Sequence, residues 1–125
     1  MAGTLTISTL SDGTNSTSAT NCIQGSAKAW AKFVANGSIT GLTSYNVSSV
    51  TYNGAGDYTI NFTNSLTDAN YSANITSAVT TGSSVPFVFN RQAQTAQTAS
   101  AFRMGVCNSG TASADTTLVS VSVFR

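Results

Sequence analysis

The chain has 125 residues, of which 41% are apolar and only 7% are charged, and it contains neither His nor Glu. An apolar fraction of this size excludes a disordered polar chain, and the single Pro excludes Pro-rich and collagen-like repeats. The formal net charge of +1 excludes a basic surface that would attract nucleic acid or anionic lipid.

The length of the chain is that of one domain, and we expect residues 1–125 to form a single β-rich unit. No apolar run reaches the roughly 20 residues of a membrane-spanning helix, so we expect no membrane insertion. The segment from Met1 to Thr4 lacks the positively charged n-region and the apolar h-region of a signal peptide, which predicts synthesis in a cytoplasm.

The N-terminal part of the chain predicts a strand, a loop and a further strand. Thr4–Ser8 alternates polar and apolar side chains, with Leu5 and Ile7 on one face, and the small polar residues of Ser11–Thr20 are typical of a loop. Ala27–Phe33 is ambiguous, because Ala and Lys favour helix whereas the strict alternation favours strand. We predict a strand there, because the surrounding sequence is rich in strand patterns.

A β-hairpin is the clearest element of the sequence. In Tyr58–Thr63 every second residue is apolar, which predicts a strand with one face in the core. Ser48–Tyr52 is the preceding strand. Asn53–Asp57 joins the two strands and contains Gly residues, which tolerate the positive φ angles of a tight connection.

The second half of the chain continues the strand pattern. Strands are predicted at Asn70–Thr76, at Val85–Phe89, around Phe102, Met104 and Val106, and around Val119, Val121 and Val123. Arg91–Ser100 is polar and has no large side chain to bury, which predicts a long loop. The chain is therefore predicted to be all-β, an antiparallel β-sandwich or small barrel of about seven or eight strands with less than about a tenth of its residues in helix.

Cys22 and Cys107 are the only cysteines. Without His, two thiolates are too few for a zinc site, so we expect no metal and no cofactor. A disulfide between them would close a long loop and stabilise the fold by up to about 4–5 kcal/mol. In a reducing cytoplasm the favoured interpretation is two buried thiols without a disulfide. The alternative is a disulfide that forms after the protein is released from a cell.

The acidic and basic side chains argue against catalysis. Asp12, Asp57, Asp68 and Asp115 each stand beside a turn-forming residue, where Asp commonly bonds its own backbone. Nothing in their spacing brings two carboxylates into one cleft. Serine and threonine nucleophiles need an activating base, and without His only lysines remain. We therefore expect a protein that is not an enzyme.

Lys28, Trp30 and Lys32 form the first candidate group for binding a partner. On a strand these side chains point the same way, which fits a surface stripe that contacts a protein or a glycan. The alternative is a half-buried Trp30 that anchors the core beneath the aliphatic stems of both lysines, and a lone Trp in a small sandwich favours it. The alternate residues from Ala27 to Phe33 would then face a closely packed neighbour, such as another subunit.

The second candidate group for binding a partner consists of Arg91, Gln92, Gln94 and Gln97, on the predicted Arg91–Ser100 loop. Gln and Thr side chains can hydrogen-bond a partner but offer no apolar mass to hold the loop against its own core. We expect this loop to reach across to a neighbouring subunit or a coat protein rather than to fold back on its own domain.

Several short sequence segments, here called sequence words, occur in a specific order along the first part of the chain. They are Gly25–Trp30 (GSAKAW), Phe33, Tyr45–Thr51 (YNVSSVT), Gly54–Thr63 (GAGDYTINFT) and Asp68–Ser72 (DANYS). The ordered set resembles a module of virion proteins of tailed bacteriophages, found at the tips of tail fibres and as short separate proteins. The resemblance covers roughly residues 11–76, about half of the chain.

The resemblance implies a β-rich, non-enzymatic part of a phage particle and carries over no catalytic residue. A tail-fibre tip normally follows a long shaft, whereas the matched words begin soon after Met1, so the chain is either a separate shell component or a fragment. We expect a capsid decoration (cement) protein that bridges coat subunits as a homo-oligomer on the virion surface, made in the host cytoplasm. The alternative is a tail-fibre tip adhesin that recognises a host-surface glycan or receptor.

Overall fold

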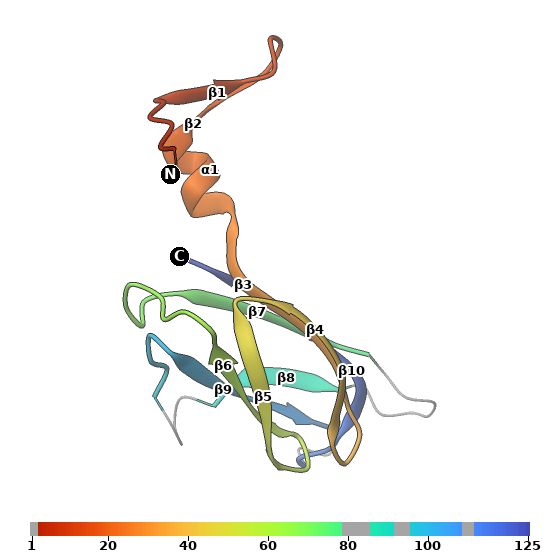
Figure 1. The fold of residues 1–125 in the computed structure, drawn as a ribbon. Coiled ribbons are helices and arrows are strands. Elements are labelled where there is room, and N and C mark those ends of the chain that lie inside the picture. Colours follow the sequence, from red (N-terminus) through yellow and green to blue (C-terminus); the bar gives the residue numbers. More distant parts are fainter. Residues whose placement is uncertain (1–2, 79–85, 92–95, 109–111) are drawn as a thin grey trace.

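The computed structural model describes residues 3–78, 86–91, 96–108 and 112–125, and its main body is a sandwich of two four-stranded antiparallel sheets (Figure 1). The first sheet has the order β4 (Ile39–Tyr45), β3 (Ala27–Ala35), β10 (Thr116–Phe124) and β7 (Ser72–Ser77). The second has the order β5 (Val47–Gly54), β6 (Asp57–Phe62), β9 (Ala101–Cys107) and β8 (Phe87–Asn90). The prediction of an all-β sandwich is confirmed.

Alternation along the strands builds the core between the two sheets. Every second residue of β3 from Ala29 to Ala35 is buried, and small alanines there leave room for large side chains from the facing sheet. The rings of Phe33 and Tyr58 pack edge to face across this space, with their centroids 5.9 Å apart. The largest fully buried side chains are Tyr58, Phe33, Phe102, Ile60, Met104, Val106, Val119 and Val123.

The β5–β6 hairpin is confirmed, and Gly56 shows why its turn requires glycine. Gly56 has a φ angle of +65°, and a Cβ atom there would lie 2.2 Å from the carbonyl oxygen of Val106. Both the left-handed backbone and the close approach of a neighbouring strand therefore disfavour any side chain. The carbonyl of Gly56 accepts a hydrogen bond from the Val106 amide at 2.9 Å, which joins the turn to β9.

Apart from β4, which the sequence analysis did not predict, the other strands of the sandwich match the sequence prediction with shifted ends. The ambiguous Ala27–Phe33 segment is a strand and continues to Ala35. The strand predicted at Asn70–Thr76 is β7, and the alternating segments near Phe102 and Val121 are β9 and β10. The strand predicted at Val85–Phe89 is β8, while Val85 lies outside the described residues.

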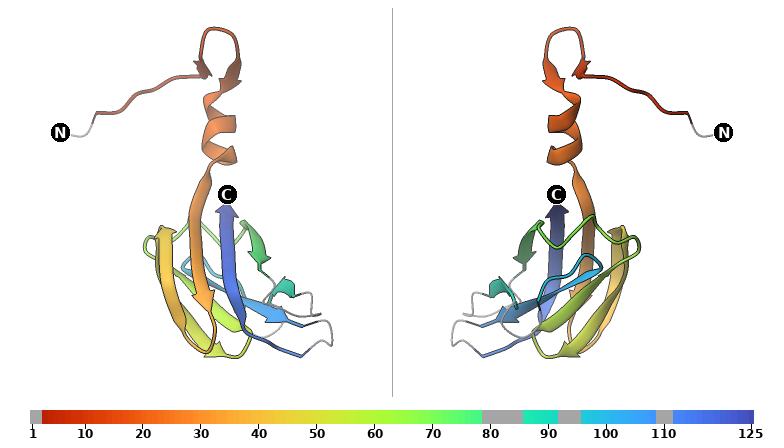
Figure 2. Two further views of the ribbon diagram at one scale, coloured as in Figure 1. Left: turned by 90° about the vertical axis from the view of Figure 1, so that its right-hand side faces the viewer. Right: turned by 90° about the vertical axis from the view of Figure 1, so that its left-hand side faces the viewer.

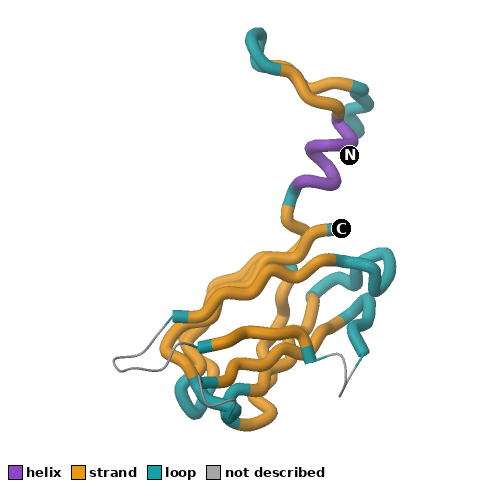
Figure 3. Tube along the Cα trace, turned by 180° about the vertical axis from the view of Figure 1, so that it is seen from behind, coloured by secondary structure: helices purple, strands orange, loops and turns teal. Residues whose placement is uncertain are grey.

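Residues 3–26 form an arm that stands away from the sandwich (Figures 1 and 2). The arm contains the hairpin of β1 (Thr9–Ser11) and β2 (Ser16–Ser18), followed by the helix α1 (Ala19–Gly25), which leads into β3. Figure 3 shows the hairpin at the tip of the arm, with α1 between it and the sandwich. Within the described residues no helix is long and apolar enough to cross a membrane.

The strand predicted at Thr4–Ser8 is wrong. Residues 3–8 have no regular structure, and Leu5 is 81% exposed. Alternation of side chains predicts a strand only where a second strand satisfies the backbone, and this segment pairs with none among the described residues.

The loop predicted at Ser11–Thr20 is also wrong, because this segment holds the turn of the β1–β2 hairpin and the start of α1. Asp12 closes the turn by accepting hydrogen bonds from the amides of Thr14 and Asn15 at 2.9 and 2.7 Å. Ser18 begins the helix, because its hydroxyl accepts a hydrogen bond from the Asn21 amide at 3.1 Å. The small polar residues therefore act as turn and cap residues.

Candidate functional site

The side chains of Lys28, Trp30 and Lys32 lie on the outer face of the first sheet, because the alternate residues of β3 fill the core. Trp30 is 39% exposed, so the prediction that it anchors the core is wrong. The inward positions from Ala29 onward pack against the second sheet and not against another subunit. The strand thus presents the surface stripe that the sequence offered as the other interpretation.

Trp30 has an exposed aromatic neighbour at the paired position of the adjacent strand. Tyr45 of β4 is opposite Trp30 and is 59% exposed. On the other side, Ser122 of β10 is opposite Trp30, and Asn74 of β7 is opposite Ser122. These four residues form a row across the sheet, here called the aromatic row, with two rings, a hydroxyl and an amide.

The outer face around the aromatic row carries positive charge without a carboxylate. Lys32 makes no hydrogen bond or ion pair with another described residue. The ammonium group of Lys28 donates to the carbonyl of Ile23 and to the hydroxyl of Ser26, both neutral acceptors. The four strands of this sheet contain neither Asp nor Glu.

Two members of the second predicted group, Gln92 and Gln94, lie outside the described residues. Gln97 is bound to its own domain, because its amide nitrogen donates to the carbonyls of Ala69 at 2.6 Å and Tyr71 at 2.9 Å. The described end of the loop therefore folds back on the sandwich, unlike the expected reach to a neighbour. The physical reason is that the partly buried amide of Gln97 holds the loop by hydrogen-bonding backbone carbonyls, without any apolar side chain.

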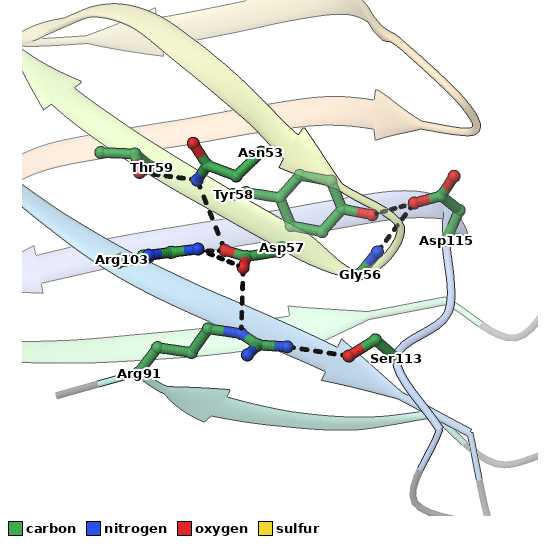
Figure 4. A network of polar contacts seen from close by, with 9 residues as sticks. All are labelled: Asn53, Gly56, Asp57, Tyr58, Thr59, Arg91, Arg103, Ser113 and Asp115. Atoms are coloured by element: carbon green, nitrogen blue, oxygen red, sulfur yellow. Dashed lines mark hydrogen bonds and ion pairs between the residues drawn. The ribbon is translucent and has the colours of Figure 1, made fainter. Parts of the chain in front are cut away.

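Arg91 belongs to a charged network on the outer face of the second sheet (Figure 4). Asp57 accepts hydrogen bonds from Nε and Nη2 of Arg103 at 2.7 and 2.5 Å, a bidentate pair. Nε of Arg91 lies 3.8 Å from the same carboxylate, and its Nη2 donates to Ser113 at 2.9 Å. The Arg103 hydrogen bonds hold the pKa of Asp57 below its ordinary value, so this carboxylate is ionised and engaged.

Asp115, just before β10, binds the connections between other strands. Its Oδ1 accepts hydrogen bonds from the Tyr58 hydroxyl at 2.8 Å and the Gly56 amide at 2.9 Å, and its Oδ2 accepts from the Gly37 amide at 2.8 Å and the Tyr52 hydroxyl at 3.0 Å (Figure 4 shows the Oδ1 contacts). Burial raises the pKa of Asp115, but these hydrogen bonds outweigh it and leave the pKa below its ordinary value.

The prediction that each aspartate hydrogen-bonds the backbone of its own turn is confirmed for two of the four. Asp12 bonds the backbone of its own turn, and Asp68 accepts a hydrogen bond from the Asn70 amide at 2.7 Å. Asp57 and Asp115 instead join residues far apart in sequence, which spacing alone does not reveal. No cluster of three or more His, Cys, Asp or Glu that would suit a metal ion occurs in the described part of the chain.

The arm carries an apolar surface that the sequence analysis missed. Leu5, Leu10 and Ile23 are 81%, 53% and 64% exposed. Together with Ile7 and Cys22 they line a shallow hollow on the arm. The sequence analysis predicted a strand over Thr4–Ser8, which would have placed Leu5 in the core. The only sequence signal for the helix beside this surface is Ser18, a residue type that commonly caps a helix N-terminus.

Both cysteines are free, as favoured for a reducing cytoplasm, although each is only partly buried. Cys22 lies on α1 in the arm, whereas Cys107 ends β9 in the sandwich. The two thiols therefore belong to separate parts of the molecule.

Comparison with known proteins finds no match, whether against protein-family models, curated proteins or solved structures. Two surfaces remain as candidates for function. They are the apolar hollow of the arm and the aromatic row of the first sheet.

Proposed function

We propose that the chain is a non-enzymatic structural protein of a tailed-phage particle, a head decoration protein that assembles with its own copies and with coat subunits. The phage assignment rests on the ordered sequence words from Gly25 to Ser72. The observation that carries the assembly role is the arm, which exposes a group of large apolar side chains away from its own sandwich.

The arm lacks the support that would hold it folded in isolation. Its strands are three residues long and its helix has seven residues, none of them buried. A lone hairpin and a helix shorter than about 12–15 residues are each marginal in water. Covering the exposed apolar side chains on a neighbouring subunit would stabilise them by about 1.5–3 kcal/mol each. The arm therefore fits the role of a connector between subunits.

In the part of the chain that the structure describes, each aspartate is engaged in hydrogen bonds, which supports a role without catalysis. Asp57 and Asp115 are held in hydrogen bonds that keep their carboxylates ionised. Asp68 is paired with Arg125, and Asp12 closes a turn. A general acid or base needs a pKa near the working pH, and the shifts found here move the other way.

The aromatic row favours a second candidate function, an adhesin that binds host-surface glycan. Exposed Trp30 and Tyr45 lie at paired positions, so their rings can stack on a sugar ring, and the hydroxyl and the amide in the same row can hydrogen-bond its hydroxyl groups. This candidate needs few copies at the tail, whereas decoration needs many copies over the head.

The assembly role is tested by measuring the oligomeric state of the full chain with size-exclusion chromatography and light scattering. We expect an oligomer that dissociates when Leu10 and Ile23 are both replaced by Ser, with the thermal unfolding of the sandwich unchanged. The matched control is Phe87→Ser, an equally exposed apolar side chain on β8. A wild-type monomer at high concentration, or equal dissociation of the control, would refute the role of the arm.

The phage assignment is tested separately by electron microscopy of particles labelled with an antibody to this chain. Dense labelling over the head supports decoration, and labelling at the tail alone supports adhesion. A preparation of particles without label would overturn both candidates.

A further inference from the structure

We infer that the aromatic row and its flanking lysines form a binding surface for an acidic polysaccharide. This inference deepens the adhesin candidate and does not depend on the arm. It rests on three features of the outer face of the first sheet: two exposed rings in register, uncompensated positive charge, and a rim of neutral hydrogen-bonding side chains.

The rings supply a stacking platform. Trp30 and Tyr45 are directly opposite on β3 and β4, where paired side chains stand about 4.5–5.5 Å apart at Cβ. Both are more than a third exposed, at 39% and 59%. Large, rigid rings can stack on the apolar face of a pyranose while their N–H or O–H group stays hydrogen-bonded to water.

The charge on this face favours an acidic sugar over a neutral one. Lys32 has no partner among the described residues, and Lys28 contacts only neutral oxygens. The aspartates lie elsewhere: on the arm, on the second sheet, and in the connections before β7 and β10. The two lysines are four residues apart on one strand, about 13 Å, so they can reach carboxylates on separate sugar units.

The rim consists of small neutral donors and acceptors. In the neighbouring row, Lys32 is opposite Thr43 on one side and Ser120 on the other, and Thr76 is opposite Ser120. Hydroxyl and amide groups match the hydroxyl groups of a sugar. A nucleic acid would instead require many cations, because its phosphates are dense along the strand, and this chain has a net charge of only +1.

The test uses the intrinsic fluorescence of Trp30, which is the only Trp in the chain and therefore reports on this surface directly. The full-length protein is titrated with oligogalacturonate and oligomannuronate. Neutral oligogalactose, a single-stranded oligonucleotide and phosphatidylserine vesicles are titrated in parallel. We expect a saturable change in emission with an acidic oligosaccharide, weakened by added salt, and a clearly weaker response to the other probes.

Variants assign the binding to individual side chains. Tyr45→Ala is expected to weaken binding about tenfold or more through loss of stacking, and Lys32→Gln roughly twofold to fivefold. Phe87→Ala on the second sheet is the matched control, with an exposed aromatic ring and no expected effect. Circular dichroism checks that each variant is folded.

Several results would overturn the inference. These are the absence of saturation with both acidic probes, equal affinity for neutral oligogalactose, tighter binding of the oligonucleotide or the vesicles, or equal weakening by Phe87→Ala. None of them bears on the oligomeric state, so failure of this inference and failure of arm-mediated assembly are distinguishable.

Discussion

At the scale of single residues, Asp115 connects parts of the chain that no local pattern joins. It accepts hydrogen bonds from two backbone amides and two tyrosine hydroxyls, on residues between 57 and 78 positions away in sequence. One of these partners, Tyr58, is fully buried in the core. Loss of this carboxylate would leave several donors without acceptors, which costs more than a typical hydrogen bond contributes.

Asp115→Asn is therefore expected to lower the free energy of unfolding by about 2–4 kcal/mol, because the new amide group turns a donor toward donors. Urea denaturation followed by circular dichroism measures the loss. The control is Asp12→Asn in the β1–β2 turn, where Asn also accepts backbone amides and the change should stay within about 0.5 kcal/mol. Equal effects of the two substitutions would contradict the role assigned to Asp115.

At the scale of elements, β6 shows how alternation assigns each residue to the core or to the outer face. Ile60 is completely buried. Its neighbour Thr59 lies on the outer face, paired with Thr51 on one side and Arg103 on the other. The same alternation on β3 places the alanines inside and Trp30 outside.

Ile60→Asp should be among the most damaging substitutions, with a loss of about 4 kcal/mol or more in the free energy of unfolding, because it buries an unpaired charge. Thr59→Asp should cost less than about 1 kcal/mol, since nearby Arg103 and Asp57 oppose each other in their effect on the new charge. Thermal unfolding of both variants measures the difference. Similar damage at the two positions would refute the assignment of faces.

At the scale of the whole molecule, the small number of charges determines the response to pH and salt. The chain has no His, and only four carboxylates and five cationic side chains. All four Asp pKa values lie below the ordinary value of 3.8, and those of Tyr52, Tyr58 and Tyr71 lie above the ordinary value of 10.0.

Stability should therefore be flat between about pH 5 and 9. Aspartates with depressed pKa values stabilise the fold above their ordinary pKa, and this contribution is lost as the pH falls through their folded-state values. Tyrosines with raised pKa values, Tyr71 at about 12, stabilise the fold below pH 10, and this contribution is lost as the pH rises further. Urea unfolding across this range measures the plateau. A step between pH 6 and 7 would contradict it, because no His titrates there.

Assembly through the arm should resist salt, because the exposed residues of the arm are apolar or neutral apart from Asp12. Oligomers and particle-bound protein should persist at high sodium chloride concentration, as sedimentation of particles with bound protein would show. Dissociation at a few hundred millimolar salt would mean that the five cations contribute more than proposed here.

The period-two pattern predicted the sandwich and its central hairpin, because burial of one face imposes alternation on strands such as β3, β6 and β10. It did not predict β4, whose residues are mostly exposed and do not alternate between buried and exposed. The positive φ angle at Gly56 was also predicted, because backbone conformation in a tight turn depends on the local sequence. Alternation also predicted that the side chains of Lys28, Trp30 and Lys32 share one face of the strand.

Only the tertiary structure decided which face of β3 is buried, since alternation gives two faces and does not say which one meets the second sheet. It also decided that Asp115 receives hydrogen bonds from three other segments, that Gln97 returns to its own domain, and that Leu5 lies outside the core. Each of these depends on a neighbour distant in sequence, and a strand, an amide or an apolar side chain gains its free energy only when that neighbour is in place.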